Sequence, residues 1–265
     1  MTIITSRSNP KVKQIRALRQ KKTRQETGTF LVEGIHHVGE AAEAGVEIQS
    51  ILYAPDLLRS EFAQNLIAGL SNANIPCYPA APEVFKYAAE KENPQGILAV
   101  IHQFETDLDE LTPQSFDWGV AIFSPQDPGN IGTIMRTIDA VGASGLILID
   151  SSADPFHPSA VRASMGTLFW NSITRTSFYE FSNWAINGGY TIYGSSAHGD
   201  LDYQELDTFT TPCVLLMGSE REGLKPEHQN ICENVLRLPL QGRTSSLNLG
   251  VAAGVLLYSM KRKRS

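Results

Sequence analysis

The sequence predicts an α/β protein with a smaller N-terminal α/β domain and a larger C-terminal domain whose mostly parallel sheet is covered by helices. Strand-like apolar runs alternate with helical patterns through both halves of the chain, and this alternation is typical of parallel sheets. Between the halves lies an acidic, weakly patterned stretch at about residues 103–115, which is typical of a linker. We therefore expect one domain over residues 1–106 and a second over residues 116–265.

The N-terminal half is expected to begin with a helix. Asn9 is a typical N-cap, and Pro10 follows it at the first helical position. Val12, Ile15 and Leu18 then recur at three-residue spacing, so they share one apolar face. Further strands are expected at 29–32, 48–53, 75–78 and 96–102, and helices at 34–44, 60–72 and 82–89.

The C-terminal half repeats the alternation of strands and helices. Its run GLILID, at 145–150, is apolar enough for a strand that is buried on both faces. Because ligands of such sheets lie beyond the carboxyl ends of the strands, the loops 127–136, 218–224 and 241–248 are candidate binding loops. Strands are expected at 118–124, 145–150, around 173, 190–193, 213–217 and 235–240, and helices at 131–140, 159–166 and 247–258.

The composition is that of an ordinary soluble protein, with 42% hydrophobic and 19% charged residues in a chain of 265. No apolar run reaches membrane-spanning length, and the N-terminus lacks the apolar core of a signal peptide. The three cysteines are scattered, which indicates neither a disulfide framework nor a metal site. We expect a cytoplasmic protein without a metal ion and without a membrane partner.

Charge is distributed unevenly along the chain. The net charge is −6, yet residues 1–24 hold eight Lys/Arg and no acidic residue, and residues 261–264 read KRKR. This placement indicates a nucleic-acid partner that the overall charge alone would argue against. We interpret the KRKR tail as a ragged, solvated end. The candidate RNA-binding residues are Arg7, Lys11, Lys13, Arg16, Arg19 and Lys22.

The candidate loops do not match common nucleotide-binding motifs. DPGNIGTIMR, at 127–136, lacks the spacing and the lysine of a P-loop, and no GxGxxG follows a strand, which argues against a Rossmann dinucleotide site. GSEREGL places Glu220 and Glu222 directly after the strand CVLLM. The last passage leads from a polar turn into a helix with small residues at Gly250, Ala252, Ala253 and Gly254, which would allow another backbone to approach closely.

Together these stretches resemble the SpoU (TrmH-like) branch of the SPOUT methyltransferases. The first motif of that family matches PGNIGTIMRTIDAVGA, with Asn130 and Arg136. The second matches LLMGSEREGL, with Glu220, and the third matches LPLQGRTSSLNLGVAAGVLLY, with Ser246 and Asn248. The resemblance covers roughly residues 118–260. Residues 1–100 are similar to the substrate-binding domain that precedes the catalytic domain in ribosomal-RNA members of the family.

The resemblance implies a C-terminal trefoil knot, a homodimer, and S-adenosylmethionine as the methyl donor for an RNA 2′-hydroxyl, most simply of ribosomal RNA. It implies catalytic roles for Asn130, Arg136, Glu220, Ser246 and Asn248. The positions that match cofactor contacts, or neighbour them as apolar walls, are Met217, Gly218, Leu238, Leu240 and Leu247. The chain departs from the family pattern at two positions, with Leu240 where methionine is common and Gly250 where serine is common.

The role of Arg136 follows from the chemistry of its side chain. A guanidinium with a pKa above about 12 is a poor general base, so we expect Arg136 to hold a phosphate beside the target ribose and to stabilise the developing alkoxide. The sequence leaves the proton acceptor open. It also leaves two alternative functions open: a transfer-RNA methyltransferase of the same family, and a non-catalytic RNA-binding protein with this fold.

Overall fold

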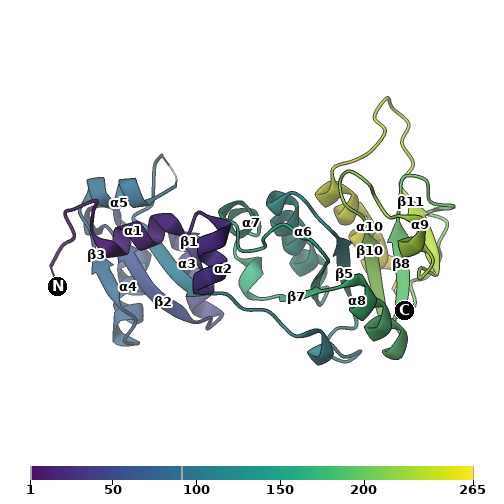
Figure 1. The fold of residues 1–265 in the computed structure, drawn as a ribbon, viewed down its shortest axis with the longest axis horizontal. Helices are drawn as coiled ribbons and strands as arrows, with labels where there is room; N and C mark the ends of the chain where they lie inside the picture. The colour runs from purple at the N-terminus through teal and green to yellow at the C-terminus, as the bar shows by residue number, and fades with distance from the viewer. Residues whose placement is uncertain (1, 91, 265) are drawn as a thin grey trace. The chain divides into compact units, whose positions relative to one another are not determined.

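The computed structural model describes residues 2–90 and 92–264. Contacts between residues divide the chain into two compact units. The first unit contains Met1–Gln103 together with Phe156–Phe169, and the second contains Phe104–Pro155 together with Trp170–Ser265. Both units are mixed α/β structures, and Figure 1 shows their helices and strands coloured by position along the chain.

The first unit is built around a four-stranded sheet in the order β1-β4-β2-β3. β4 pairs antiparallel with both β1 and β2, and β2 pairs parallel with β3. The predicted strands are confirmed, with bounds that differ by a few residues. The strands are β1 (Thr29–Glu33), β2 (Ile48–Tyr53), β3 (Cys77–Pro79) and β4 (Ile97–His102).

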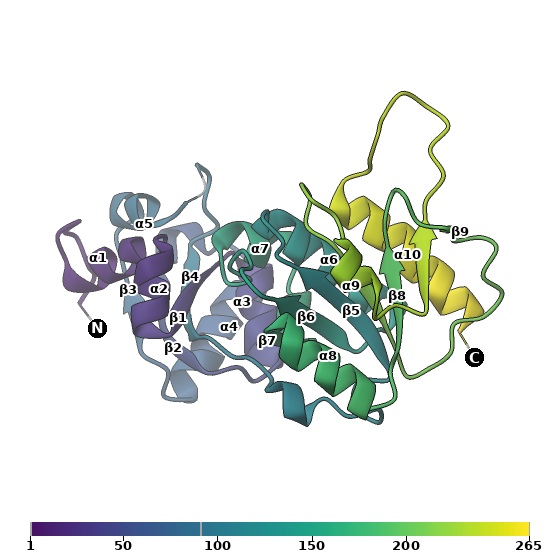
Figure 2. The same cartoon turned by 45° about the vertical axis from the view of Figure 1, so that its right-hand side comes forward.

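Helices cover both faces of this sheet (Figure 2). The predicted first helix is confirmed with its cap, because the Asn9 side chain accepts a hydrogen bond of 2.9 Å from the backbone N–H of Lys11. Val12 and Ile15 on this helix and Val84 and Phe85 on α5 are buried together against one face of the sheet. The helices of the unit's N-terminal part are α1 (Pro10–Ala17), α2 (Lys21–Thr27), α3 (Ile35–Glu43), α4 (Glu61–Asn72) and α5 (Pro82–Ala88).

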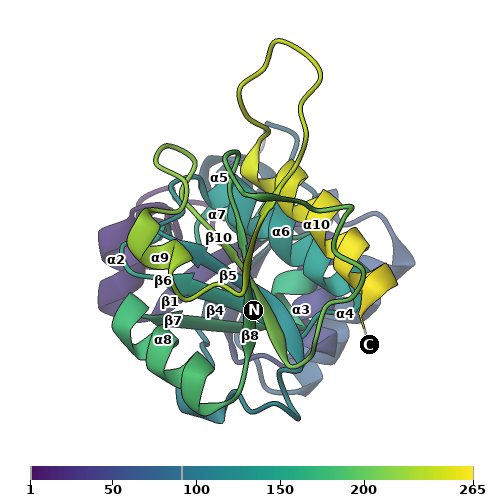
Figure 3. The ribbon, with the colours of Figure 1, turned by 90° about the vertical axis from the view of Figure 1, so that its right-hand side faces the viewer.

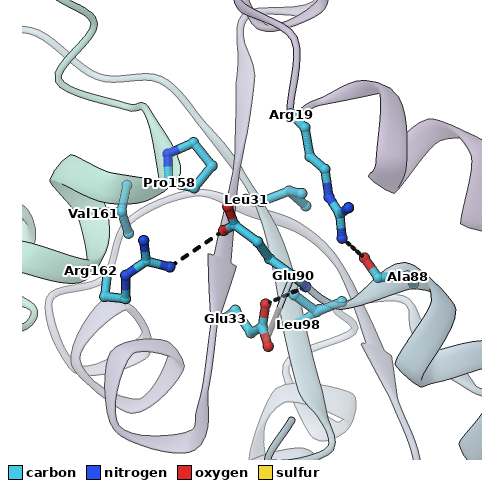
Figure 4. Close-up of a pocket in the computed structure, with 9 residues that line it drawn as sticks. All are labelled: Arg19, Leu31, Glu33, Ala88, Glu90, Leu98, Pro158, Val161 and Arg162. Atoms are coloured by element: carbon cyan, nitrogen blue, oxygen red, sulfur yellow. Dashed lines mark hydrogen bonds and ion pairs between the residues drawn. The ribbon is translucent and has the colours of Figure 1, made fainter. Parts of the chain in front are cut away.

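A segment from the C-terminal half completes the first unit. This inserted segment, residues 156–169, carries α7 (Pro158–Ala163) and a short 3-10 turn at Thr167–Phe169. Its Phe156 ring lies 4.7 Å from the ring of Phe30, and Arg162 pairs with Glu90 at 3.5 Å (Figure 4). Chain order alone places the segment with the C-terminal domain, since these contacts join residues that are far apart in the sequence.

The second unit contains a seven-stranded sheet in which every neighbouring pair of strands is parallel. The strand order is β7-β6-β5-β10-β8-β11-β9. This confirms the mostly parallel sheet that the sequence predicts. The strands are β5 (Trp118–Phe123), β6 (Gly145–Ile149), β7 (Ser172–Thr176), β8 (Thr191–Ser195), β9 (Leu201–Asp202), β10 (Cys213–Met217) and β11 (Asn234–Arg237).

The order of the strands changes direction next to β5. From β5 the chain continues outward through β6 and β7, and it then returns to the other side of β5 with β8 and β10. α6 (Pro128–Val141) and α10 (Leu249–Lys263) lie on one face of the sheet, and α8 (Phe178–Asn187) and α9 (Pro226–Gln229) lie on the other (Figure 3). In such a sheet the crevice at the point of reversal is the expected ligand site.

The helix α6 begins earlier than the sequence pattern indicates. The helix was expected to begin at residue 131 after a turn, but Pro128 is its first residue and the Asp127 side chain accepts a hydrogen bond of 2.8 Å from Gly129 N–H. The helix ends at Gly142, whose φ of 71° lies in the left-handed region that a residue without a Cβ adopts readily. The expected turn is therefore the first turn of α6.

The contact between α6 and α10 explains some of the small residues near the C-terminus. A Cβ on Gly250 would lie 3.1 Å from the Thr133 methyl carbon, and Ala253 is fully buried. A Cβ on Gly254 would meet nothing within 4 Å. The neighbour of Gly250 is thus a side chain of α6 and not the backbone that the sequence analysis expected, and the expectation is wrong at Gly254.

The interpretation of the KRKR tail as a ragged end is also wrong. α10 continues to Lys263, whose ammonium donates to the carbonyl groups of Gln204 and Leu206 at 2.8 and 2.7 Å. Arg264 pairs with Asp117 at 2.7 Å and lies 4.8 Å from the centre of the Trp118 ring. Two of the four basic residues therefore attach the end of the chain to the second unit.

In the part of the chain that the structure describes, no helix is both long enough and apolar enough to cross a membrane. The threading of the C-terminal segment through a preceding loop stays a prediction of the family resemblance.

Candidate active site

A cavity of roughly 620 Å³ opens at the carboxyl ends of three adjacent strands. Its walls come from residues 195–198 at the end of β8, residues 217–224 at the end of β10, and residues 238–252 between β11 and the first turn of α10. The loop between β11 and α10 extends away from the sheet in Figure 1. Because β10, β8 and β11 are neighbours, parallel pairing brings these three loops to one edge.

A chain of hydrogen bonds joins the three motifs along one side of this cavity. The Asn130 side-chain N–H donates to Glu220 Oε1 at 2.9 Å, and the Asn248 side-chain N–H donates to Asn130 Oδ1 at 2.9 Å. Asn248 Oδ1 in turn accepts from the backbone N–H groups of Gly250 and Val251, at 2.9 and 3.3 Å. The chain connects the N-terminus of α6, the loop after β10 and the N-terminus of α10.

The Glu220 carboxylate is held by several donors. Besides Asn130, the backbone N–H groups of Gln126 and Asp127 donate to it at 2.9 and 3.2 Å. Partial burial raises the pKa of Glu220, but the hydrogen bonds from Asn130, Gln126 and Asp127 outweigh this, so the pKa lies below its usual range. Glu220 is therefore ionised at neutral pH, and its charge lies next to the N-terminus of α6, where the helix dipole favours an anion.

Four of the five candidate catalytic residues come together. Glu220, Ser246 and Asn248 line the cavity, and Asn130 contacts two of them without lining it. Arg136 is exposed on α6, six positions after Asn130, and does not line the cavity. The three loops of this polypeptide therefore lie together, but Arg136 lies outside the cavity that they line.

All five candidate cofactor-contact residues line the cavity: Met217, Gly218, Leu238, Leu240 and Leu247. The loop that follows β10 is closed on itself, because Ser219 bridges to Gly223 and the Ser219 hydroxyl oxygen accepts a hydrogen bond of 3.2 Å from the backbone N–H of Glu222. A Cβ on Gly218 would overlap the backbone of Gly223. The absence of a side chain at Gly218 is therefore required to close this loop.

The sequence analysis missed the residues that follow β8. Ser195, Ser196, Ala197 and His198 line the cavity together with Gln229 of α9. The strand itself was predicted, and it is followed by small polar residues in GSSAHG. What the pattern lacked was the strand order, since only the pairing of β8 with β10 brings this loop to the cavity.

His228 is buried next to Gln229, which lines the cavity. Its ring is 3% exposed and lies 3.9 Å from the ring of Phe123 and 4.7 Å from that of Phe178. Burial lowers the pKa of His228, and its neutral Nδ1 accepts a hydrogen bond of 3.2 Å from Lys225 N–H. This fixes α9, whose Gln229 side chain donates to the Leu224 carbonyl at 2.7 Å.

The candidate RNA-binding residues of the first unit differ in what they contact. The guanidinium groups of Arg7 and Arg16 lie over the ring of Tyr87, and the Lys11 ammonium lies over the ring of Tyr78. Lys13 is exposed. Lys22 is exposed and pairs with Glu26 at 3.8 Å.

Arg19 has a structural environment of its own. Its guanidinium donates to the carbonyl groups of Ala88 and Ala89 at the end of α5, beside a small cavity of about 30 Å³ (Figure 4). These bonds attach the segment after α1 to α5. Arg19 is therefore engaged in the fold of the first unit, which leaves fewer of its donors for RNA than the sequence alone suggests.

No group of three or more His, Cys, Asp or Glu residues that could hold a metal ion occurs within residues 2–90 and 92–264.

Two family models match the chain. The model described as the SpoU rRNA Methylase family matches residues 118–258, and the one described as the MRM3-like substrate binding domain matches residues 9–99. The first match covers more than half of the chain and includes the three loops of the site. The chain belongs to the SpoU rRNA methylase family. The resemblance of the sequence motifs to this family is thereby confirmed.

Relatives of this SpoU family member extend over both units. A 23S rRNA (uridine(2479)-2′-O)-methyltransferase of Streptomyces viridochromogenes is 35% identical, covering 98% of this chain and 92% of the relative. A 23S rRNA (guanosine(2553)-2′-O)-methyltransferase of Bacillus subtilis is 32% identical over 98% of this chain and all of the relative. The crystal structure of an AdoMet-bound rRNA methyltransferase from Sinorhizobium meliloti matches with a TM-score of 0.90 and 36% identity, covering 98% of this chain and 97% of that one.

Proposed function

We propose that this protein is an S-adenosylmethionine-dependent methyltransferase of the cytoplasm that modifies a ribose 2′-hydroxyl of ribosomal RNA. The observation that carries the proposal is the hydrogen-bonded chain from Glu220 through Asn130 to Asn248, which borders a cavity lined by all five candidate cofactor residues. Family membership and two relatives named as 23S rRNA 2′-O-methyltransferases support the reaction and the substrate class.

The cavity suits S-adenosylmethionine in size and in lining. Roughly 620 Å³ lies within the range of about 300–1,000 Å³ typical of small-molecule sites. Leu238, Leu240 and Leu247 would supply apolar walls, and backbone groups of the loop from Gly218 would approach the ligand closely. When bound, the cofactor supplies an electrophilic methyl group on a sulfonium.

The side chains of the site bind and orient rather than exchange protons. Glu220 already accepts three hydrogen bonds and its pKa is lowered, so it is a poor proton acceptor. Asn130 and Asn248 have no basic atom at neutral pH. Arg136 keeps its charge and can bind a phosphate through a planar pair of N–H groups. We therefore assign Glu220, Asn130 and Asn248 to fixing the loops, and Arg136 to the RNA.

Ribosomal RNA is favoured over transfer RNA by the first unit. The substrate-binding model covers residues 9–99, and two relatives that match 98% of the chain are named 23S rRNA methyltransferases. A purely structural RNA-binding role is disfavoured, because the loop residues of the three motifs are all present and Glu220, Asn130 and Asn248 are connected.

The proposal includes a homodimer, for which α10 provides a surface. Val251, Val255 and Tyr258 are 54%, 38% and 57% exposed, and their spacing places them on one face of the helix. An apolar stripe of this kind fits a second copy of the chain. Val255→Glu should give a monomer in size-exclusion chromatography with light scattering, whereas Phe62→Glu, at an exposed apolar residue of α4, should not change the mass.

The activity is tested with the purified full chain, labelled S-adenosylmethionine and protein-free ribosomal RNA. We expect label in the RNA that survives alkaline hydrolysis as a 2′-O-methylated dinucleotide, and no label with Asn248→Ala. Label in transfer RNA alone would establish the alternative substrate. Calorimetry that detects no cofactor binding would overturn the proposal.

A further inference from the structure

The first unit carries two arginines around one aromatic ring. The guanidinium carbon of Arg16 lies 3.8 Å from the centre of the Tyr87 ring, and that of Arg7 lies 5.0 Å from the same centre. Arg16 belongs to α1, Arg7 to the segment before it, and Tyr87 to α5. Both guanidinium carbons are close to one point, so they lie within about 9 Å of each other.

Neither arginine has an acidic partner. In the described part of the chain, no carboxylate lies within ion-pair distance of Arg7 or Arg16. Arg16 donates one hydrogen bond of 2.9 Å, to the Tyr87 carbonyl, and its remaining N–H groups make no hydrogen bond with the described residues. Since each guanidinium has five N–H donors, most of them stay available to an external acceptor.

The ring also restricts the two side chains before any ligand binds. A guanidinium that stacks on an aromatic face has fewer rotamers to lose when it meets an anion. Tyr87 is 36% exposed, so it holds the arginines at the surface rather than in the core. Lys11, whose ammonium lies 5.3 Å from the Tyr78 ring, extends the same arrangement to the neighbouring turn of α1.

We propose that Arg7 and Arg16, held around Tyr87, form a clamp for the phosphodiester backbone of the substrate RNA. The clamp rests on the proposed function and specifies how the first unit takes part in it. One phosphate, or two successive phosphates of one strand, can accept hydrogen bonds from both guanidinium groups. Such contacts fix position and carry no sequence information, so the clamp contributes affinity and register while the target nucleotide is selected elsewhere.

The test measures binding of the full chain to protein-free large-subunit ribosomal RNA at several salt concentrations. Arg7→Gln and Arg16→Gln should each lower the affinity and reduce the slope of log K against log salt by about 1, because one phosphate contact is lost. Arg59→Gln removes the same charge from an exposed position before α4, where no aromatic ring of the described residues holds the guanidinium, and should leave the slope unchanged. Slopes for Arg7→Gln and Arg16→Gln equal to that of Arg59→Gln would overturn the clamp.

Tyr87→Leu distinguishes the contribution of the aromatic ring to RNA affinity from the contribution of the two charges. It removes no charge, so the salt slope should stay near that of the unchanged chain while the affinity falls. The double variant Tyr87→Leu with Arg7→Gln should lose less binding free energy than the sum of the losses of the two single variants, since both substitutions disrupt the same arrangement. Additive effects would mean that the ring does not organise Arg7.

Two further measurements keep the outcomes distinct. Thermal unfolding of each variant shows whether Arg16→Gln merely loosens α1 from α5. If it does, the test rests on Arg7→Gln, which breaks no hydrogen bond within the described residues. Methylation by the unchanged chain tests the proposed function separately. Methylation with unaltered salt slopes would overturn only the clamp, and altered slopes without any methylation would overturn only the function.

Discussion

The amide of Asn130 donates to the carboxylate of Glu220 at 2.9 Å, and this one bond sets the direction of the whole hydrogen-bonded chain. An ionised carboxylate can only accept, so the Asn130 N–H must face Glu220 and its oxygen must face Asn248. Asn248 then turns its own oxygen toward the free N–H groups at the start of α10. A single charge thereby orients two amides and caps a helix.

Glu220→Gln is expected to disturb this order without changing the shape of the side chain. A glutamine amide can present either its oxygen or its N–H group to Asn130, so the direction of the chain is no longer fixed. We expect a loss of about 2 kcal/mol in the free energy of unfolding of the second unit, typical of hydrogen bonds to a charged group. Urea unfolding checks this, with Glu222→Gln, at an exposed glutamate of the same loop, as the matched control.

The same carboxylate should make stability depend on pH. The folded-state pKa of Glu220 is lowered, so its contribution is complete above the ordinary carboxyl pKa and is lost as the pH falls through the folded-state value. The stability difference between the unchanged chain and Glu220→Gln should therefore be constant near neutrality and shrink below about pH 4.5. If the stability difference between the two proteins stays the same in acid, the charge of Glu220 does not cause it.

Arg136→Ala should leave folding and cofactor binding nearly unchanged, because Arg136 is exposed and does not line the cavity. Methyl transfer should fall by about a hundredfold or more, as when one stabilising donor is removed from an active site. Arg136→Lys should also be poor, since an ammonium cannot reproduce a planar pair of donors. Near-normal turnover of the lysine variant would contradict the role assigned to Arg136.

Gly218→Ala is expected to damage the loop after β10 rather than fill the cavity. The added Cβ would overlap the backbone of Gly223, so the loop must open at a cost of about 1–3 kcal/mol. Calorimetry should show weakened cofactor binding, and urea unfolding should show lower stability. Gly69→Ala in α4, where a Cβ meets nothing within 4 Å, should be neutral or stabilising.

Local pattern was sufficient to predict most of the elements that carry the site. The apolar runs that became β5 and β10 are short, continuous and bounded by turn residues, and the segments after them contain Asn130 and Glu220. Asn248 follows the predicted run that became β11. The helix α8 went unpredicted although its start carries a capping box, in which Ser177 and Glu180 bond each other's backbone N–H groups. Attention to that signal would have found it.

Other features could not follow from local pattern. The inclusion of residues 195–198 in the cavity depends on the strand order, and the engagement of Arg19 depends on α5, some seventy positions away in sequence. Lys263 and Arg264 look like a solvated tail until their distant carbonyl and carboxylate partners are known. In each case the decisive contact is long-range, and one sequence carries no record of it.

The last prediction concerns a fragment that starts after residue 106. The sequence boundary suggests that such a fragment would fold, but it would keep the inserted segment 156–169 while losing the rest of the unit into which that segment packs. Phe156 and Leu168 are 0% and 1% exposed, and Phe169 is 7% exposed. Uncovering each of these side chains costs about 1.5–3 kcal/mol and leaves an apolar surface.

We therefore expect the fragment to aggregate or to unfold at a lower temperature than the full chain, as measured by light scattering and thermal unfolding. Replacing Phe156 and Phe169 by serine in the fragment should restore solubility, because the removal of the first unit exposes these two apolar side chains. The same pair of substitutions in the full chain should instead be destabilising, since both side chains are buried there. A fragment that stays monodisperse without these substitutions would mean that the inserted segment does not depend on the first unit for its burial.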